Sequence, residues 1–138
     1  MKKWYVVKNV LTKQEAEQLG ENVRHRDFNE VVIDRCVKEI KKLVEVNTDT
    51  PAYCLVEARP RGHVWHTDIG TSNHMTWCKY SASILLTKPE EFSGGYFKTK
   101  KNTYKKDHYL NMLLYSSDVE HCVEPSEGNR KTLLMFFG

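Results

Sequence analysis

The chain has 138 residues, with 21 Lys and Arg against 18 Asp and Glu, so its formal net charge is only +3. That excess is too small to indicate nucleic-acid binding by itself, and no apolar run approaches the roughly 18 residues of a membrane span. A hydrophobic fraction of 40% and a length of this order fit one globular domain, residues 1–138. The segment Met1–Lys8 contains no signal-peptide core, so we expect an intracellular, cytoplasmic protein.

The first third of the chain predicts one strand and two helices. Trp4–Val7 is a short β-favouring run. Thr12 and Glu15 have the spacing of a capping box and predict a helix to about Arg24. A second helix is expected over about 28–46, ended by the turn-forming run before Pro51. Its apolar positions recur every three or four residues, at Phe28, Val32, Cys36, Ile40 and Leu43, and predict one core-facing stripe.

After Pro51 the pattern changes to short strands separated by turn residues. The strands are expected at 53–58, 79–86, 96–99, 109–115 and 131–137. Two helices followed by many short strands predict an α+β, mainly β fold: an antiparallel sandwich with the helices packed on one sheet. The helical support is expected over about 12–47 and the β core over about 52–138. The dispersed cysteines Cys36, Cys54, Cys78 and Cys122 lack C-x-x-C spacing and are expected to be buried or half-buried thiols.

The run His66-Thr67-Asp68 carries the strongest chemical signal. In an extended strand, residues i and i+2 lie on one face, roughly 6.6 Å apart at Cα, so this imidazole and carboxylate can converge on one cation. His121, at the head of another strand-like run, is the best candidate for a third ligand. Two histidines and one carboxylate are the ligand set of non-haem Fe(II) oxygenases.

An ordered set of motifs surrounds these residues. It comprises Gly62, His66-x-Asp68, Ser81–Leu86, Gly94-Gly95, Leu113–Ser116, His121 and Gly128-x-Arg130. In this order the motifs resemble the 2-oxoglutarate- and Fe(II)-dependent oxygenase family, specifically its prolyl 4-hydroxylase-like branch, over nearly the whole chain. The resemblance implies a double-stranded β-helix (jelly-roll) core with Fe(II) bound by His66, Asp68 and His121. It also implies 2-oxoglutarate and O2 as cosubstrates, with ascorbate as a further candidate cofactor.

The distal carboxylate of 2-oxoglutarate needs a cation in a pocket away from water. Arg130 suits this role because its planar fork can hold a carboxylate through two hydrogen bonds, and Thr132 points the same way along the strand. Lys131 points to the opposite face and is the second choice, although counting from His121 would favour it over Arg130. Many relatives place a tyrosine against 2-oxoglutarate, and Tyr53 and Tyr80 are the candidates here, although core packing is the better expectation for each.

The implied reaction converts 2-oxoglutarate and O2 to succinate and CO2 while hydroxylating a peptide or protein residue, with proline favoured by the branch similarity. Trp65 and Trp77 flank the proposed site in sequence, and the intervening 69–78 predicts a mobile loop. The functional interpretation is an aromatic wall and lid around a peptide, and the alternative is ordinary packing.

Other functions remain open from the sequence. The same jelly-roll could be a non-catalytic metal- or ligand-binding module, or a dioxygenase with a non-prolyl substrate. A zinc site using His63, His66, His74 and Cys78 is disfavoured, because His63 and His66 would face opposite sides of one strand. A nucleic-acid demethylase is also disfavoured: the lysine-rich segment 98–106 could contact phosphates, but Phe136 occupies the position of the second arginine of those enzymes. We therefore expect no membrane and no nucleic-acid partner.

Overall fold

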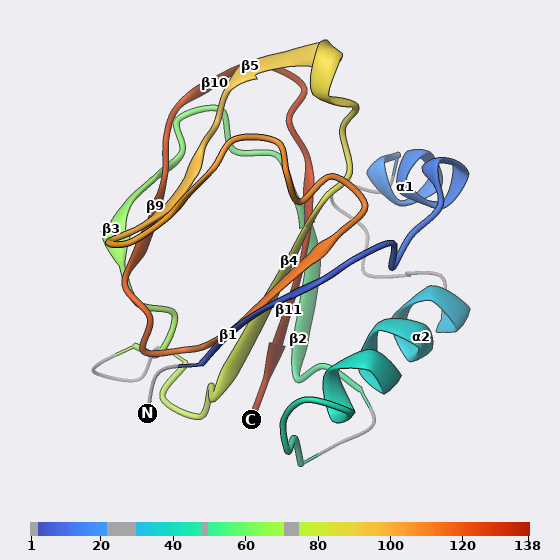
Figure 1. The fold of residues 1–138 in the computed structure, drawn as a ribbon, viewed down its shortest axis with the longest axis vertical. Helices are drawn as coiled ribbons and strands as arrows, with labels where there is room; N and C mark the ends of the chain where they lie inside the picture. Colours follow the sequence, from blue (N-terminus) through green and yellow to red (C-terminus); the bar gives the residue numbers. More distant parts are fainter. Residues whose placement is uncertain (1–2, 22–29, 48–49, 71–74) are drawn as a thin grey trace.

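Two antiparallel sheets face each other, and two helices cover the outer face of the larger one (Figure 1). The computed structural model describes residues 3–21, 30–47, 50–70 and 75–138. The larger sheet has the strand order β1 (Trp4–Val7), β8 (Met112–Ser116), β4 (Tyr80–Leu85), β11 (Thr132–Phe137) and β2 (Tyr53–Glu57). The smaller sheet has the order β3 (His63–His66), β9 (His121–Val123), β6 (Phe97–Thr99) and β7 (Thr103–Tyr104). A two-stranded ribbon joins β10 (Ser126–Gly128) to β5 (Phe92–Gly94), which follows a 3-10 turn at Pro89–Glu91.

Strand β11 shows how side-chain alternation divides the molecule into two layers. Leu133, Met135 and Phe137 belong to the core between the larger sheet and the helices. Thr132, Leu134 and Phe136 point the other way and line a pocket between the two sheets. The same strand thus supplies both core residues and site residues.

Helix α1 (Lys13–Gly20) begins with the predicted capping box: Glu15 N–H donates to the Thr12 hydroxyl at 3.1 Å, and Thr12 N–H donates to the Glu15 carboxylate at 2.9 Å. The helix ends at Gly20, although it was expected to continue to about Arg24. Glu21 is not helical, and residues 22–24 lie outside the described residues.

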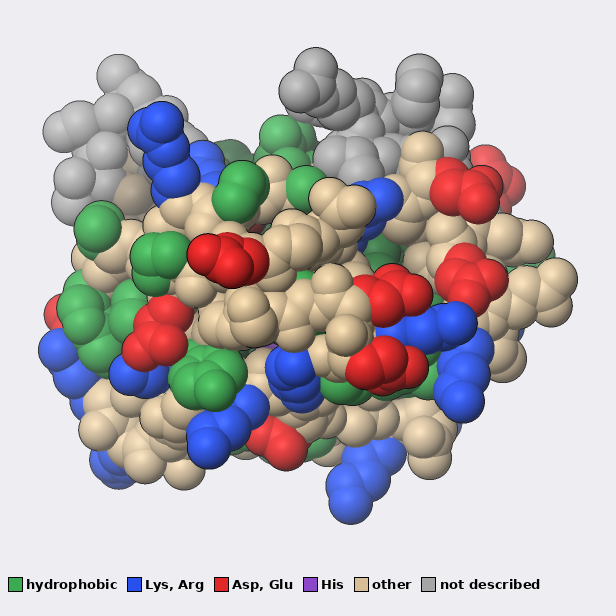
Figure 2. Space-filling model, turned by 90° about the horizontal axis from the view of Figure 1, so that it is seen from above, with side chains coloured by type: hydrophobic (Ala, Val, Ile, Leu, Met, Phe, Trp, Pro, Cys, Tyr) green, Lys and Arg blue, Asp and Glu red, His purple; other side chains and the backbone are tan. Residues whose placement is uncertain are grey.

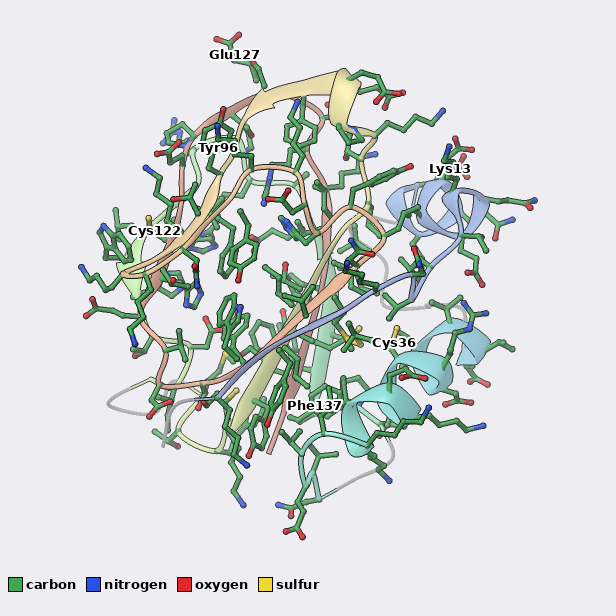
Figure 3. The ribbon with its side chains drawn as sticks, in the orientation of Figure 1. Lys13, Cys36, Tyr96, Cys122, Glu127 and Phe137 are labelled. Atoms are coloured by element: carbon green, nitrogen blue, oxygen red, sulfur yellow. The ribbon has the colours of Figure 1, made fainter. Side chains whose placement is uncertain are left out.

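Helix α2 (Glu30–Lys41) is shorter than the predicted 28–46. Val32, Cys36 and Ile40 are buried as expected, while Phe28 lies outside the described residues. The prediction that Leu43 faces the core is wrong, because this residue occupies the turn after α2, where its N–H donates to the Ile40 carbonyl, and it is 39% exposed. Figure 3 shows Cys36 and Phe137 in the layer between α2 and the larger sheet.

The predicted strand at 109–115 begins only at Met112. Leu110 has a positive φ of 63°, which breaks the extended chain, and Tyr109 makes a single parallel bridge to Leu85. The three-residue strands β5 and β10 and the two-residue β7 were not predicted, because such short runs carry little periodic signal. The four thiols are free and buried or half-buried, as expected.

In the described part of the chain, no helix combines the length and apolar character needed to cross a bilayer. Acidic and basic side chains are interspersed across the face shown in Figure 2.

Candidate metal centre and cosubstrate pocket

Pairing of β3 with β9 brings the two predicted histidine ligands together. His66 lies directly opposite His121 in the antiparallel register, and their ring centroids are 4.3 Å apart. Strand β3 ends at His66, so Asp68 follows it in a turn, where the Asp68 N–H donates to the Ser117 carbonyl at 3.0 Å. One ligand atom from each of the three side chains lies within 4.8 Å of the others, a grouping found nowhere else among the described residues.

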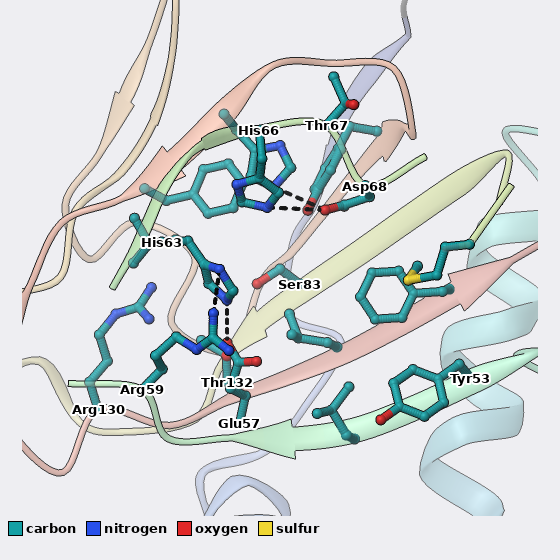
Figure 4. Close-up of a pocket in the computed structure, with 18 residues that line it drawn as sticks. Tyr53, Glu57, Arg59, His63, His66, Thr67, Asp68, Ser83, Arg130 and Thr132 are labelled. Carbon is teal, nitrogen blue, oxygen red and sulfur yellow. Dashed lines mark hydrogen bonds and ion pairs between the residues drawn. The ribbon is translucent and has the colours of Figure 1, made fainter. Parts of the chain in front are cut away.

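Backbone contacts fix how the two imidazoles face the aspartate. His66 Nδ1 lies 2.6 Å from the Val64 carbonyl, and His121 Nδ1 lies 2.9 Å from the Val119 carbonyl. A carbonyl can only accept, so each Nδ1 carries a hydrogen, and Nε2 is the nitrogen that each ring turns toward the aspartate. These Nε2 atoms lie 3.4 Å and 3.3 Å from the same oxygen, Asp68 Oδ1 (Figure 4). Each Nε2–H can donate to the Asp68 carboxylate in this arrangement. Once these hydrogens are lost, two imidazoles and one carboxylate offer lone pairs to one centre, a donor set that fits Fe(II).

The aspartate is held ionised within this cluster. Burial alone would raise the pKa of Asp68, but hydrogen bonding by His121 and His66 lowers it well below its usual range. Its second oxygen, Oδ2, is buried and has no hydrogen-bond partner within the described ranges. This oxygen is therefore available to a bound cation.

One expectation about β3 is wrong. Strand alternation predicts His63 and His66 on opposite faces, but a register shift between them, a β-bulge, turns both rings toward the pocket, with centroids 5.0 Å apart. The two residues inside the bulge, Val64 and Trp65, are 85% and 43% exposed. His63 is nevertheless not part of the metal cluster, because other partners occupy its ring.

His63 bridges two charged residues on the pocket wall. Arg59 Nη1 lies 2.6 Å from His63 Nδ1, and since a guanidinium only donates, Nδ1 is the acceptor. The hydrogen is then on His63 Nε2, which donates to Glu57 Oε1 at 3.2 Å. Burial raises the pKa of Glu57, but this hydrogen bond and the nearby arginines outweigh burial and lower it. Glu57 lies opposite Thr132 in the β2–β11 register.

A pocket of about 380 Å³ extends from the metal ligands between the two sheets, a size typical of small-molecule sites. Its walls include side chains from both sheets and from the segment after β3. The lining residues with charged, polar or aromatic side chains include Tyr53, Glu57, Arg59, His63, His66, Asp68, Phe97, Tyr115, His121, Arg130 and Thr132.

Arg130 and Thr132 both line this pocket, on the side away from the metal ligands (Figure 4). Arg130 Nε and Nη2 are buried and have no hydrogen-bond partner in the part of the chain that the structure describes. Burial lowers the pKa of this guanidinium to about 10, partly offset by Glu57, so it stays charged at neutral pH. A buried cation with unpaired donors is the counterpart that a carboxylate ligand requires.

The other candidate residues are divided between the pocket and elsewhere. Lys131 does not line the pocket: its Nζ donates to the Gly20 carbonyl at 2.9 Å, on the helix side of the sheet. Tyr80 also lies outside, packed against the main core, whereas Tyr53 lines the pocket. Trp65 and Trp77 are each 43% exposed, and Lys100 Nζ lies 3.9 Å from the centre of a Trp65 ring.

Several pocket residues were missed at the sequence level. Glu57 is the only charge in the predicted strand 53–58, and a charge in an otherwise apolar strand could have drawn attention to it. Tyr115 sits in the same strand-like run as core leucines and carries no such signal. Its ring contacts His121 at 5.1 Å, and burial and the nearby Asp68 raise its pKa well above the usual range, so it stays protonated.

Comparison with solved structures identifies the fold. No family model matches the sequence, and no curated protein matches it. The viral collagen prolyl hydroxylase of Paramecium bursaria Chlorella virus-1, solved with 2-oxoglutarate, aligns with a TM-score of 0.66 at 13% identity, over 97% of this chain and 93% of its own. A Pseudomonas putida prolyl-4-hydroxylase aligns with a TM-score of 0.70 at 14% identity, over 97% and 91%.

A Burkholderia pseudomallei oxidoreductase of the 2OG-Fe(II) oxygenase family aligns over 78% of this chain and 56% of its own, with a TM-score of 0.57 at 16% identity. The similarity to all three is one of fold. The chain therefore has the jelly-roll fold of the prolyl 4-hydroxylase-like 2-oxoglutarate and Fe(II) oxygenases.

Proposed function

We propose that this protein is an Fe(II)- and 2-oxoglutarate-dependent dioxygenase that hydroxylates a residue of a peptide or protein, with proline as the target. The observation that carries the proposal is a single pocket with a candidate metal centre at one end and an unpaired cation at the other. At one end the ligand atoms of His66, Asp68 and His121 lie within 4.8 Å of one another. At the other end, the Arg130 guanidinium has buried, unpaired donors.

The two ends match the two ends of 2-oxoglutarate. His66, Asp68 and His121 would hold Fe(II), and Arg130 with Thr132 would bind the distal carboxylate of the cosubstrate. When bound, the iron would supply the oxidative decarboxylation chemistry that turns 2-oxoglutarate and O2 into succinate and CO2 and oxidises the substrate. Glu57 and Arg59, linked through His63, would shape the wall between these ends.

The protein residues also define where a substrate approaches. The His121 side chain is only 4% exposed and Asp68 10%, whereas His66 is 31% exposed. The centre is thus closed on the β9 side and open beside β3, next to the exposed Trp65. We place the peptide there, against Trp65, and keep Trp77, which lies next to Gly138 after β11, as a second candidate for substrate contact. Two of the structural neighbours are prolyl hydroxylases by name, which supports proline as the target residue.

The test has a binding step and a turnover step. Anaerobic addition of Fe(II) and then 2-oxoglutarate should produce the weak visible charge-transfer band of a chelated keto acid. Aerobic incubation with proline-containing peptides, with ascorbate to keep the iron ferrous, should release succinate and add 16 Da to one peptide. A band without succinate from any peptide would instead support a non-catalytic binding module, and hydroxylation at another residue would exclude the prolyl assignment alone.

A further inference from the structure

The turn between β2 and β3 carries two arginines, Arg59 and Arg61, at the edge of the metal pocket. Both residues are exposed and line a surface hollow formed by residues 57–62, and Arg59 also lines the metal pocket itself. Neither arginine forms an ion pair with a carboxylate among the described residues. The one hydrogen bond of the Arg59 guanidinium in this part of the chain goes to the uncharged ring of His63.

The carboxylates on the strands next to this turn do not neutralise it. Glu57, at the end of β2, accepts a hydrogen bond from His63 at 3.2 Å. Glu124, just after β9, pairs with Lys98, and Glu127 on β10 projects away from the molecule (Figure 3). The turn therefore presents two cations whose charge the described part of the protein leaves unpaired, which favours an anionic partner.

The backbone of this turn is fixed in place. The Gly62 N–H donates to the Arg59 carbonyl at 3.1 Å, and the Ser126 N–H donates to the Pro60 carbonyl at 2.9 Å. Gly62 has a φ of +70°, and a Cβ at this position would collide with the Val123 carbonyl, so the turn packs closely on the end of β9. A partner that binds the two arginines thus does not have to order the backbone that carries them.

Hydrogen bonding and ring packing connect Arg59 to the metal ligands. Arg59 Nη1 lies 2.6 Å from His63 Nδ1, and the His63 ring lies 5.0 Å from the ring of His66, centroid to centroid (Figure 4). His66 is the metal ligand on the open side of the centre. An extended peptide advances about 3.3 Å per residue, so an acidic residue bound at Arg59 would lie within about three positions of the residue presented to the metal.

We propose that Arg59 and Arg61 form a carboxylate-binding rim that selects peptide substrates with an acidic residue close to the hydroxylated one. This rests on the proposed function, because the rim acts on the substrate of that reaction. The rim differs from the cosubstrate anchor: the unpaired donors of Arg130 are buried, whereas Arg59 and Arg61 are exposed at the mouth. Exposed cations are screened by solvent, so they contribute a preference among peptides and not the main binding energy.

The experiment compares two proline peptides of equal length, with either Glu or Gln on both sides of the proline. For the wild-type protein with Fe(II) and 2-oxoglutarate, kcat/KM should be about five- to tenfold higher for the Glu peptide at low ionic strength. The difference should lie mainly in KM and should fall toward one in about 0.5 M salt, because exposed charges are screened.

Charge reversal separates the rim from general effects of charge and packing. Arg61→Glu should bring the Glu/Gln ratio of kcat/KM below one, and a third peptide with Lys beside the proline should become the best of the three. Arg59→Gln should also lower the Glu/Gln ratio. The matched control is Lys38→Glu, which makes the same charge change at an exposed position of α2, on the far side of the larger sheet. Its Glu/Gln ratio should stay within about twofold of the wild-type ratio.

Equal kcat/KM for the Glu and Gln peptides in the wild type would overturn the rim and leave the proposed function standing. A Glu/Gln ratio unchanged in Arg61→Glu would place the preference elsewhere and also overturn the rim. If no peptide is hydroxylated, the proposed function fails, and the Kd values of the same peptides for the Mn(II)- and 2-oxoglutarate-loaded protein, from fluorescence anisotropy, decide the rim alone. A Glu preference that reverses in Arg61→Glu would support it, and equal Kd values would overturn it.

Discussion

Replacing Arg130 with Met should separate cosubstrate binding from metal binding and from folding. Truncating one side of a buried, hydrogen-bonded charge pair typically weakens binding by about 2–5 kcal/mol. Taking about 3 kcal/mol, because Arg130 has two buried N–H groups free for the ligand, the Kd of 2-oxoglutarate should rise about 100-fold, at roughly 1.4 kcal/mol per tenfold. The free protein should not lose more than about 1 kcal/mol of stability, since methionine leaves no unpaired donor in the pocket.

The measurements are an anaerobic titration of the charge-transfer band, a metal titration without cosubstrate, and urea unfolding. Lys131→Met is the matched control: it removes a cation from the next residue of the chain, whose Nζ binds the Gly20 carbonyl instead of lining the pocket. It should leave the Kd of 2-oxoglutarate within about twofold. A larger rise in the Kd of 2-oxoglutarate for Lys131→Met than for Arg130→Met would refute the assignment of Arg130 as the carboxylate anchor. If Arg130→Met weakened metal binding as much as 2-oxoglutarate binding, the two ends of the pocket would not act separately.

Three further predictions follow from the same geometry. Saturating Mn(II), a redox-stable substitute for Fe(II), should raise the free energy of unfolding by about 2.7 kcal/mol at 100 times its Kd, and Asp68→Ala should abolish this gain; an equal gain in the variant would place the metal elsewhere. Gly95→Ala should weaken 2-oxoglutarate binding at least several-fold and leave metal affinity unchanged. The reason is that the φ of Gly95 is +69° and an added Cβ would lie 2.7 Å from Arg130 Nε, so the guanidinium would have to move. An unaltered Kd of 2-oxoglutarate would show that binding does not depend on this position of Arg130. The Glu15 carboxylate accepts hydrogen bonds from Arg35 at 2.7 and 2.9 Å, which lowers the pKa of Glu15 from 4.5 to about 2. The ion pair therefore stabilises the fold above the unfolded-state pKa, and this contribution is lost as pH falls from about 4.5 to 2. Since Arg35 is 41% exposed, Glu15→Gln should cost about 1 kcal/mol at pH 7 and almost nothing at pH 2 in urea unfolding; a loss independent of pH would exclude the charge as its cause.

Sequence patterns predicted the strands well where they are long and poorly where the chain turns. The run 131–137 alternates between two buried faces, and β11 follows it within one residue. The run 109–115 reads equally well as a strand, yet its first three residues form a turn. Local pattern cannot detect this, since the turn contacts Leu85, which is far away in the chain: Tyr109 forms the bridge to Leu85, and the Leu110 N–H donates to the Leu85 carbonyl.

The β-bulge in β3 is a second case of this kind. Alternation places His63 and His66 on opposite faces, and only the pairing of β3 with β9 shows that the extra residue turns them together. The consequence is chemical, because it places His63 in the pocket, where it links Arg59 to Glu57.

The sequence by itself indicated which side chains could form the site, through the His66-x-Asp68 spacing, the strand that begins at His121 and the Arg130-x-Thr132 spacing, although β3 ends at His66 and β11 begins only at Thr132. Tertiary structure alone decided that Arg130 lines the pocket while Lys131 does not. The physical reason is that periodicity fixes the direction of a side chain relative to its own strand. The charge and the hydrogen-bond partners around it depend on strands far away in the chain, which only the folded sheets bring together.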